Sequence, residues 1–244
     1  MIRVQNLCKR FGAVTAVDGV SFEASDGQVT GLLGPNGAGK STTLRMLYAL
    51  MKPDDGTIDV DGVDAVVDPQ GAQARLGVLP DPSGLYPRLT AREHLTYYGE
   101  LQGVSGPALT RRIDELLQIL DMGSIADRRT SGFSHGERTK VALARMLVHH
   151  PRNVLLDEPT NGLDVMSTRA VRDIIRRLRG EGCCVMFSSH VMQEVSALCD
   201  HIIVIARGRI VGSGTPDELR QQTGHQDLED VFVTLSGVEP GVAS

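Results

Sequence analysis

The sequence predicts an α/β fold with a mainly parallel sheet, a small antiparallel sheet near the N-terminus and a helical insert. Three observations carry this prediction. A glycine-rich loop separates the apolar run 29–33 from an amphipathic run that ends near residue 50. A second apolar run, 153–156, ends in two carboxylates. Between the two lies a stretch whose leucines and isoleucines recur at helical spacing from 109 to 120. Apolar strands that alternate with amphipathic helices are typical of parallel sheets covered by helices.

Length and composition favour one large domain. The chain has 244 residues, 41% of them hydrophobic, which is enough for a sizeable core. We expect a single domain over 1–244, with a core formed by 1–81 and 151–214, a helical insert over 82–150 and a C-terminal tail over 215–244. The net charge of −5 gives no general attraction to nucleic acid, so no nucleic-acid partner is expected. No signal peptide and no apolar run of about 20 residues is present, so any membrane-spanning part is expected on another chain.

The first section is expected to form antiparallel strands. Residues 1–7 are predicted to be an edge strand, and further strands are predicted over 14–22, 29–33 and 56–62. Between the first two lies Phe11, whose ring could stack on an adenine or be an ordinary core aromatic.

The glycine-rich loop fits the pattern G-x-x-x-x-G-K-[ST] at every fixed position and continues from a strand into a helix, as that motif requires. Its glycines allow the backbone N–H groups to turn toward phosphate oxygens, and the helix N-terminus adds positive potential. Lys40 is expected to reach the β- and γ-phosphates, and the Ser41 hydroxyl to bind Mg²⁺. The predicted nucleotide-binding residues of this loop are Gly34, Pro35, Asn36, Gly37, Ala38, Gly39, Lys40, Ser41 and Thr42.

The helical insert follows a short buried strand, 76–79, which ends at Asp81 between two prolines. Thr90 and Glu93 have the spacing of a capping box for the first helix of the insert. Small residues around Ser134 precede a further helix, so this point could bind an anion or could be a plain helix cap.

Asp157 and Glu158 end the second apolar strand. In phosphate-loop enzymes the first of two such acids holds Mg²⁺, and the second could act as the general base toward water. A polar turn after a strand is the alternative, but it is less common for two acids in a chain that also has Lys40. His190 follows the next strand, at the edge of the sheet where ligands bind, although a lone histidine is usually structural. A hairpin over 202–212 closes the core, and the tail is expected to be polar with one amphipathic piece, 228–235.

Taken in order, these motifs resemble the ATP-binding subunit of an ABC transporter over nearly the whole chain. The resemblance identifies the loop as Walker A and the strand ending in Asp157 and Glu158 as Walker B, on a P-loop NTPase core. It implies that Phe11 stacks on adenine, that Glu158 and His190 are catalytic, and that Asp164 belongs to the D-loop at a dimer contact. It also implies that the signature motif contacts the ATP of a partner chain through Ser134, His135, Gly136 and Glu137.

Two departures from the family pattern stand out. The signature has His135 and Glu137 where glycine and glutamine are usual. Asp81 occupies the place of the Q-loop glutamine, where it could still reach Mg²⁺. The expected metal-binding residues are therefore Ser41, Asp81 and Asp157. The stretches 85–90 and 228–232 resemble the branch that exports sodium, drugs or lipids.

The resemblance implies an ATPase that uses ATP and Mg²⁺ and drives export by ATP-dependent pairing of two cassettes. It would act as a homodimer or paired cassette at the cytoplasmic face of the membrane, bound to a separate transmembrane permease. Two alternatives stay open. A soluble ABC-type ATPase that assists assembly of another complex shares the cassette, and a small-molecule phosphotransferase shares the phosphate loop alone.

Overall fold

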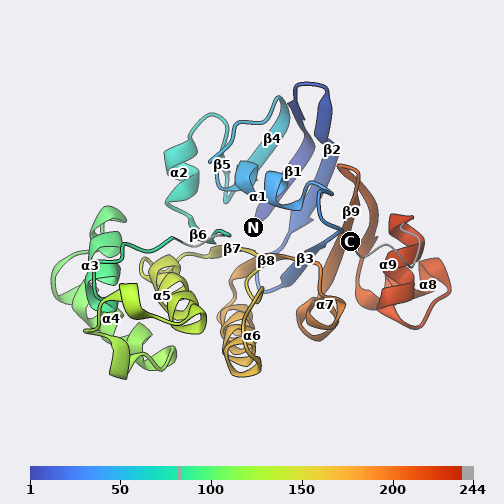
Figure 1. The fold of residues 1–244 in the computed structure, drawn as a ribbon. Coiled ribbons are helices and arrows are strands. Elements are labelled where there is room, and N and C mark those ends of the chain that lie inside the picture. The colour runs from blue at the N-terminus through green and yellow to red at the C-terminus, as the bar shows by residue number, and fades with distance from the viewer. Residues whose placement is uncertain (82–83, 238–244) are drawn as a thin grey trace.

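A computed structural model describes residues 1–81 and 84–237 of the chain. Figure 1 shows an antiparallel sheet above a second, central sheet, with helices below. The antiparallel sheet has the strand order β2-β1-β4-β5, and its strands are β1 (Ile2–Phe11), β2 (Val14–Ala24), β4 (Asp55–Val60) and β5 (Val63–Asp64). The prediction of an edge strand at the N-terminus is wrong, because β1 pairs with β2 on one side and with β4 on the other.

The central sheet has the order β10-β9-β3-β8-β7-β6 and is parallel except for β10. Its strands are β3 (Val29–Leu33), β6 (Leu76–Leu79), β7 (Asn153–Asp157), β8 (Cys184–Ser189), β9 (His201–Ala206) and β10 (Arg209–Gly214). The strand predicted over 29–33 thus belongs to this sheet and not to the N-terminal one. Parallel strands place their carboxyl ends at one edge, which is where ligands bind in such sheets. The predicted α/β fold with a mainly parallel sheet is confirmed.

Alternation along the central strands divides the core into two layers. On β8, Cys184 and Met186 belong to the cluster shared with the antiparallel sheet and α1 (Lys40–Leu47), while Val185 and Phe187 belong to the cluster shared with the helices below. All four side chains are buried. A strand covered on both faces is apolar throughout, which explains the continuous apolar runs of the sequence. The lower face is covered by α5 (His135–Leu147), α6 (Val165–Gly180) and α7 (Met192–Leu198).

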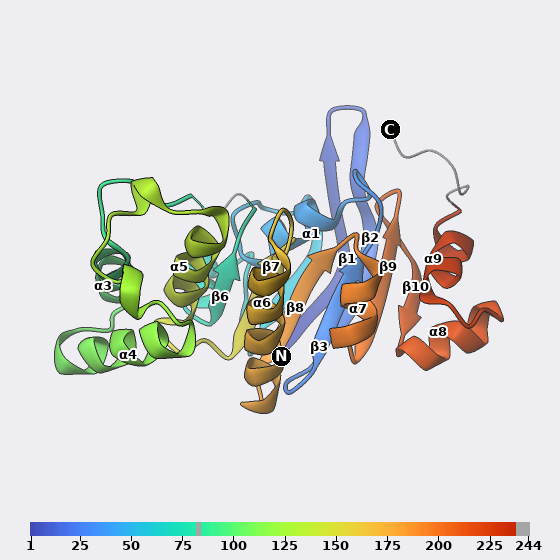
Figure 2. The ribbon, with the colours of Figure 1, turned by 60° about the horizontal axis from the view of Figure 1, so that its bottom comes forward.

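The insert forms a helical group beside the β6 edge of the sheet. Figure 2 shows α3 (Ala91–Leu101) and α4 (Gly106–Ile119) away from the strands, with α5 between them and β6. Thr90 and Glu93 form the predicted capping box. Short elements complete the fold: α2 (Pro69–Gln73) precedes β6, and the 3₁₀ turns Gly123–Ile125 and Thr130–Gly132 lie within the insert. Residues 82–83, where the insert was expected to begin, and 238–244 of the expected tail lie outside the described residues.

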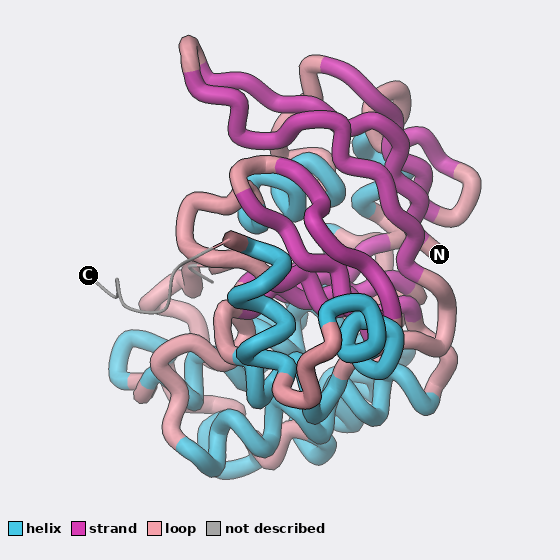
Figure 3. Tube along the Cα trace, turned by 90° about the vertical axis from the view of Figure 1, so that its right-hand side faces the viewer, coloured by secondary structure: helices cyan, strands magenta, loops and turns pink. Residues whose placement is uncertain are grey.

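Two helices follow β10 and cover its end of the central sheet, as Figure 3 shows from that side. The amphipathic piece 228–235 forms α9 (Leu228–Ser236), with Leu228 and Val231 buried. The helix α8 (Pro216–Thr223) was not predicted. The sequence nevertheless indicates where this helix begins, since Thr215 and Glu218 form a capping box around a proline in the first turn. None of the helices in the described part of the chain is both long enough and apolar enough to span a bilayer.

Candidate functional site

The phosphate loop joins β3 to α1, and close packing fixes its shape. Gly39 has φ of 105°, and a Cβ built on it would lie 2.4 Å from the carbonyl oxygen of Ala16, so no other residue fits. Lys40 is 6% exposed. Its Nζ donates to the carbonyl oxygens of Gly34 and Pro35 at 2.7 and 3.3 Å. The loop therefore curls around the lysine ammonium, which is the placement that a phosphate-binding lysine needs.

Asp157 ends β7 beside the phosphate loop. Its Oδ1 accepts hydrogen bonds from the hydroxyls of Ser188 at 2.6 Å and Ser41 at 3.2 Å. Burial raises the pKa of the Asp157 carboxyl above its usual range, against these two hydrogen bonds, and the nearby Glu158 and Asp81 act in the same direction as burial. A group of hard oxygens at this point suits Mg²⁺, which usually takes one or two protein ligands beside phosphate oxygens and water. Ser41 and Asp157 would be those ligands.

Glu158 bridges the lysine and the histidine. Its Oε1 lies 3.5 Å from Lys40 Nζ, and its Oε2 lies 2.9 Å from Nδ1 of His190. Its backbone N–H donates to the Ser188 hydroxyl, and its φ is +48°. A left-handed conformation costs a non-glycine residue about 1–2 kcal/mol, so the surrounding contacts must hold it in place. This arrangement directs the carboxylate of Glu158 toward the phosphate loop and not into the hydrophobic interior.

Lys40, Ser41, Glu158 and His190 line one cavity of about 450 Å³ at the carboxyl edge of the sheet, while Asp157, which is hydrogen-bonded to Ser41, does not line it. That volume is within the range of small-molecule sites. Its lining comes from several elements: Ala16, residues 35–42 of the phosphate loop, Asp81, Glu158, Asn161 and His190. The structure thus brings together nearly all the residues that the sequence assigned to the core half of the site. Gly34 does not line this cavity, although its carbonyl group holds Lys40.

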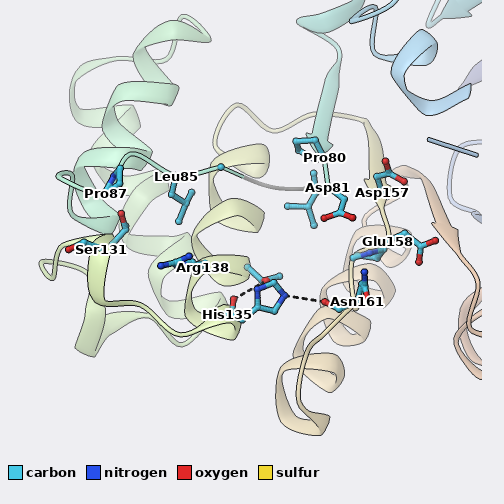
Figure 4. Close-up of a pocket in the computed structure, with 15 residues that line it drawn as sticks. Pro80, Asp81, Leu85, Pro87, Ser131, His135, Arg138, Asp157, Glu158 and Asn161 are labelled. Carbon is cyan, nitrogen blue, oxygen red and sulfur yellow. Dashed lines mark hydrogen bonds between the residues drawn. The ribbon is translucent and has the colours of Figure 1, made fainter. Parts of the chain in front are cut away.

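A second cavity, of about 330 Å³, opens between the core and the helical insert. Figure 4 shows Asp81, Asp157 and Glu158 on its core side, with Arg138 and Leu85 on the side of the insert. His135 Nε2 lies 3.1 Å from the carbonyl oxygen of Asn161, so this residue connects α5 to the loop after β7. Asp81 and Glu158 line both cavities. A shift of the insert relative to the core would therefore change the surroundings of both acids.

Ser134 and Glu137 form the start of α5. The Ser134 hydroxyl accepts from the backbone N–H of Glu137, whose carboxylate accepts from the backbone N–H of Ser134. This backbone hydrogen bond, with Arg128 close by, lowers the pKa of the Glu137 carboxyl. A Cβ on Gly136 would lie 2.4 Å from the Ser167 hydroxyl, so α5 and α6 begin in close contact. Of the four predicted signature residues, His135 alone lines either of these two cavities, namely the one between the core and the insert.

The remaining predicted residues lie at the surface. Asp164 caps α6 by accepting from the backbone N–H of Ser167, and this hydrogen bond lowers the pKa of its carboxyl. Phe11 lies at the end of β1, 48% exposed, with Lys9 Nζ 5.8 Å from its ring centre, and it lines neither cavity. Its expected role toward adenine stays a prediction. Ser188, which joins Asp157 to the backbone of Glu158, was not singled out from the sequence. The sequence could have indicated Ser188, because it lies near the end of a buried strand that is expected to neighbour the strand ending in Asp157 and Glu158.

Comparison with known proteins gives a consistent result. Residues 17–161 match the family described as ABC transporter. The chain is 42% identical over 239 residues to the ABC transporter ATP-binding protein NatA of Bacillus subtilis, covering 96% of this chain and 97% of that protein. It is 37% identical over 232 residues to the Nod factor export ATP-binding protein I of Ralstonia nicotianae, covering 95% and 72%. A solved ATP-binding subunit of an ABC transporter superposes with a TM-score of 0.90 at 28% identity, covering 96% and 99%.

Proposed function

Because the chain belongs to the ABC transporter family as an ATP-hydrolysing subunit, we propose that two copies pair head to tail around two ATP molecules and thereby drive export. The observation that carries the proposal is the division of the predicted site. Lys40, Ser41 and Glu158 line one cavity, with Asp157 hydrogen-bonded to Ser41, whereas Ser134 lies outside that cavity at the start of α5. A second chain would bring its own Ser134 and Gly136 to the nucleotide held by the first.

Within such a pair each residue has a definite task. Lys40 and the backbone N–H groups of residues 36–42 bind the β- and γ-phosphates. Ser41 and Asp157 would hold Mg²⁺, which would neutralise charge on the phosphates. Glu158 accepts a hydrogen bond from the attacking water. His190, which is held by Glu158, contacts the γ-phosphate. Catalysis is mostly positioning and charge stabilisation.

The core, residues 1–81 and 151–214, and the insert, residues 82–150, would move relative to each other as the pair closes. The cavity that lies between them supports this idea, since Asp81 and Glu158 are on one wall and Arg138 on the other. Movement of the insert would act on a separate transmembrane permease that binds the chain at the cytoplasmic face of the membrane. The name of the Nod factor export relative supports the outward direction. We propose ions, drugs or lipids as the exported class.

The shared site is tested by mixing two inactive variants. Lys40→Ala removes the cation that clamps the phosphates, and Ser134→Arg places bulk where the partner's γ-phosphate would dock. Each variant alone has two broken sites per dimer. A mixed dimer has one intact site, formed by Lys40 of one chain and Ser134 of the other. With random pairing and independent sites, mixing should restore about a quarter of the wild-type rate in a two-fold dimer.

The matched control mixes Lys40→Ala with the double variant Lys40→Ala, Ser134→Arg, a combination that forms no intact site. Light scattering follows ATP-dependent association at the same time, because paired sites that must act together would restore little activity. A phosphotransferase that works within one chain would show neither recovery nor ATP-dependent pairing, and that result would reject the proposal. Copurification of a multi-span membrane protein with the chain from detergent-solubilised membranes separates a transporter subunit from a free ATPase.

A further inference from the structure

A buried carboxylate lies behind the site, on the first turn of α7. Glu194 is 4% exposed. Its Oε2 accepts hydrogen bonds from the hydroxyls of Thr160 at 2.5 Å and Ser189 at 3.3 Å. Its Oε1 lies 3.8 Å from Nη2 of Arg172 on α6. Burying a carboxylate is unfavourable unless it is hydrogen-bonded and paired, and Glu194 is both.

The two hydroxyls lie next to Glu158 and His190, that of Thr160 in the loop after β7 and that of Ser189 at the end of β8. Thr160 follows Glu158 by two residues, and Ser189 directly precedes His190. The Ser189 hydroxyl also accepts a hydrogen bond from the backbone N–H of Val191. The residues on either side of His190 are therefore bonded to each other. Glu194 therefore joins the loop after β7 to the end of β8, at points next to Glu158 and His190.

A second, inner connection joins the ends of β7 and β8, just before the two loops begin. The Ser188 hydroxyl donates to Asp157 and accepts from the backbone N–H of Glu158. Between this inner connection and the outer one at Glu194 lies the contact of 2.9 Å between Glu158 and His190. The backbone pairing of β7 with β8 ends at Asp157 and Ser188, so the inner connection fixes only the start of the two loops, and the outer one at Glu194 fixes their course beyond it. The inner connection alone would thus leave the Glu158–His190 contact under-determined.

We infer that Glu194 is a positioning residue for ATP hydrolysis, which holds the Thr160 and Ser189 loops so that Glu158 and His190 keep their mutual geometry. The inference rests on the roles proposed above for Glu158 and His190. Glu194 touches neither nucleotide nor water in this scheme, because it is buried behind both loops. Its effect should therefore appear in kcat and not in the binding of ATP.

Thr160 offers the sharpest pair of variants. Thr160→Val keeps the shape of the side chain and removes the hydroxyl, while Thr160→Ser keeps the hydroxyl. Because small misplacements of catalytic groups have large effects on rate, we expect Thr160→Val and Glu194→Gln to lower kcat about tenfold with KM for ATP within about twofold. Thr160→Ser should stay within about twofold of wild type. Gln193→Ala is the control on the same helix, since it removes an exposed contact with Glu229 and leaves the loops untouched.

Repeating Thr160→Val in a His190→Ala background separates positioning from general damage, with single-turnover measurements where steady-state rates are too slow. If Glu194 acts through the Glu158–His190 geometry, the tenfold loss should shrink to less than about twofold once His190 is gone. Equal losses in both backgrounds, or a Thr160→Val variant as fast as Thr160→Ser, overturn the inference. If Glu158→Gln and His190→Ala themselves keep full turnover, it is the proposed catalytic roles that fail, and that outcome is distinct.

Discussion

The core edge around Lys40 and the start of α5 at Ser134 are both expected to touch ATP, yet their side chains are paired in different ways. At the core edge the functional groups pair with one another: Lys40 and His190 both contact Glu158, and Ser41 contacts Asp157. At the start of α5, Ser134 and Glu137 pair with each other to begin a helix, and Glu137 also pairs with the neighbouring Arg128. The first region holds charges that a nucleotide and Mg²⁺ can take over. The second is a well-formed surface that becomes part of a site only against another chain.

A substitution at Glu158 tests the difference between the core edge and the start of α5 most directly. Glu158→Gln removes the proposed general base and should lower kcat by about 10² to 10⁴. Affinity for ATP and ATP-dependent association should persist, because the phosphate loop and the surface at Ser134 are unchanged. Hydrolysis and nucleotide affinity are measured on the same preparation, with the exposed Glu100→Gln as control. Turnover within about threefold of wild type would remove Glu158 from the role of base.

Asp81 tests whether the two regions communicate, since it lines both the phosphate cavity and the cavity beside the insert. Loss of a carboxylate near a metal typically costs about 10- to 100-fold in metal affinity or activity. We expect the Mg²⁺ concentration for half-maximal hydrolysis to rise at least tenfold in Asp81→Ala, while ATP affinity changes little.

Asp81→Asn keeps one oxygen at the same place and should lie between Asp81→Ala and the wild type. A collapse of ATP affinity with unchanged Mg²⁺ dependence would mean that Asp81 is a structural turn residue.

The core edge could be predicted from the sequence because its motifs are local. The phosphate loop, the acids after β7 and His190 after β8 are each recognisable within a few residues, and parallel strands then place them at one edge. What could not be predicted depends on distant pairing. Ile2 faces Val60 across β1 and β4, and nothing near residue 2 shows that this strand has a neighbour on both sides.

The role inferred for Glu194 belongs to the same class. It depends on Thr160, Ser189 and Arg172, which come together only in the fold. By contrast, α8 was missed although its capping box at Thr215 is local. The polar composition of this stretch favours a tail, whereas the capping box marks the start of a helix within four residues.

The smallest expected effect lies in the second region, at Glu137, and concerns stability before activity. Glu137→Ala removes half of the capping box of α5 and should lower the free energy of unfolding by about 1 kcal/mol. Glu137→Gln keeps an oxygen that can accept from the Ser134 N–H and should cost less. Because the folded pKa of Glu137 is lowered by that hydrogen bond, its contribution is present above the ordinary glutamate pKa of about 4.3 and is lost as pH falls through the folded value.

Denaturant unfolding of both variants at neutral and acidic pH measures this contribution, and the gap between Glu137→Ala and wild type should narrow in acid. If Glu137 serves the helix alone, kcat should change less than about twofold at temperatures where all variants are folded. A fully stable Glu137→Ala variant that fails to associate in the presence of ATP would contradict the view that Glu137 serves only the start of α5. It would mean that the carboxylate at the start of α5 takes part in the contact between chains, and that this region is a site in its own right.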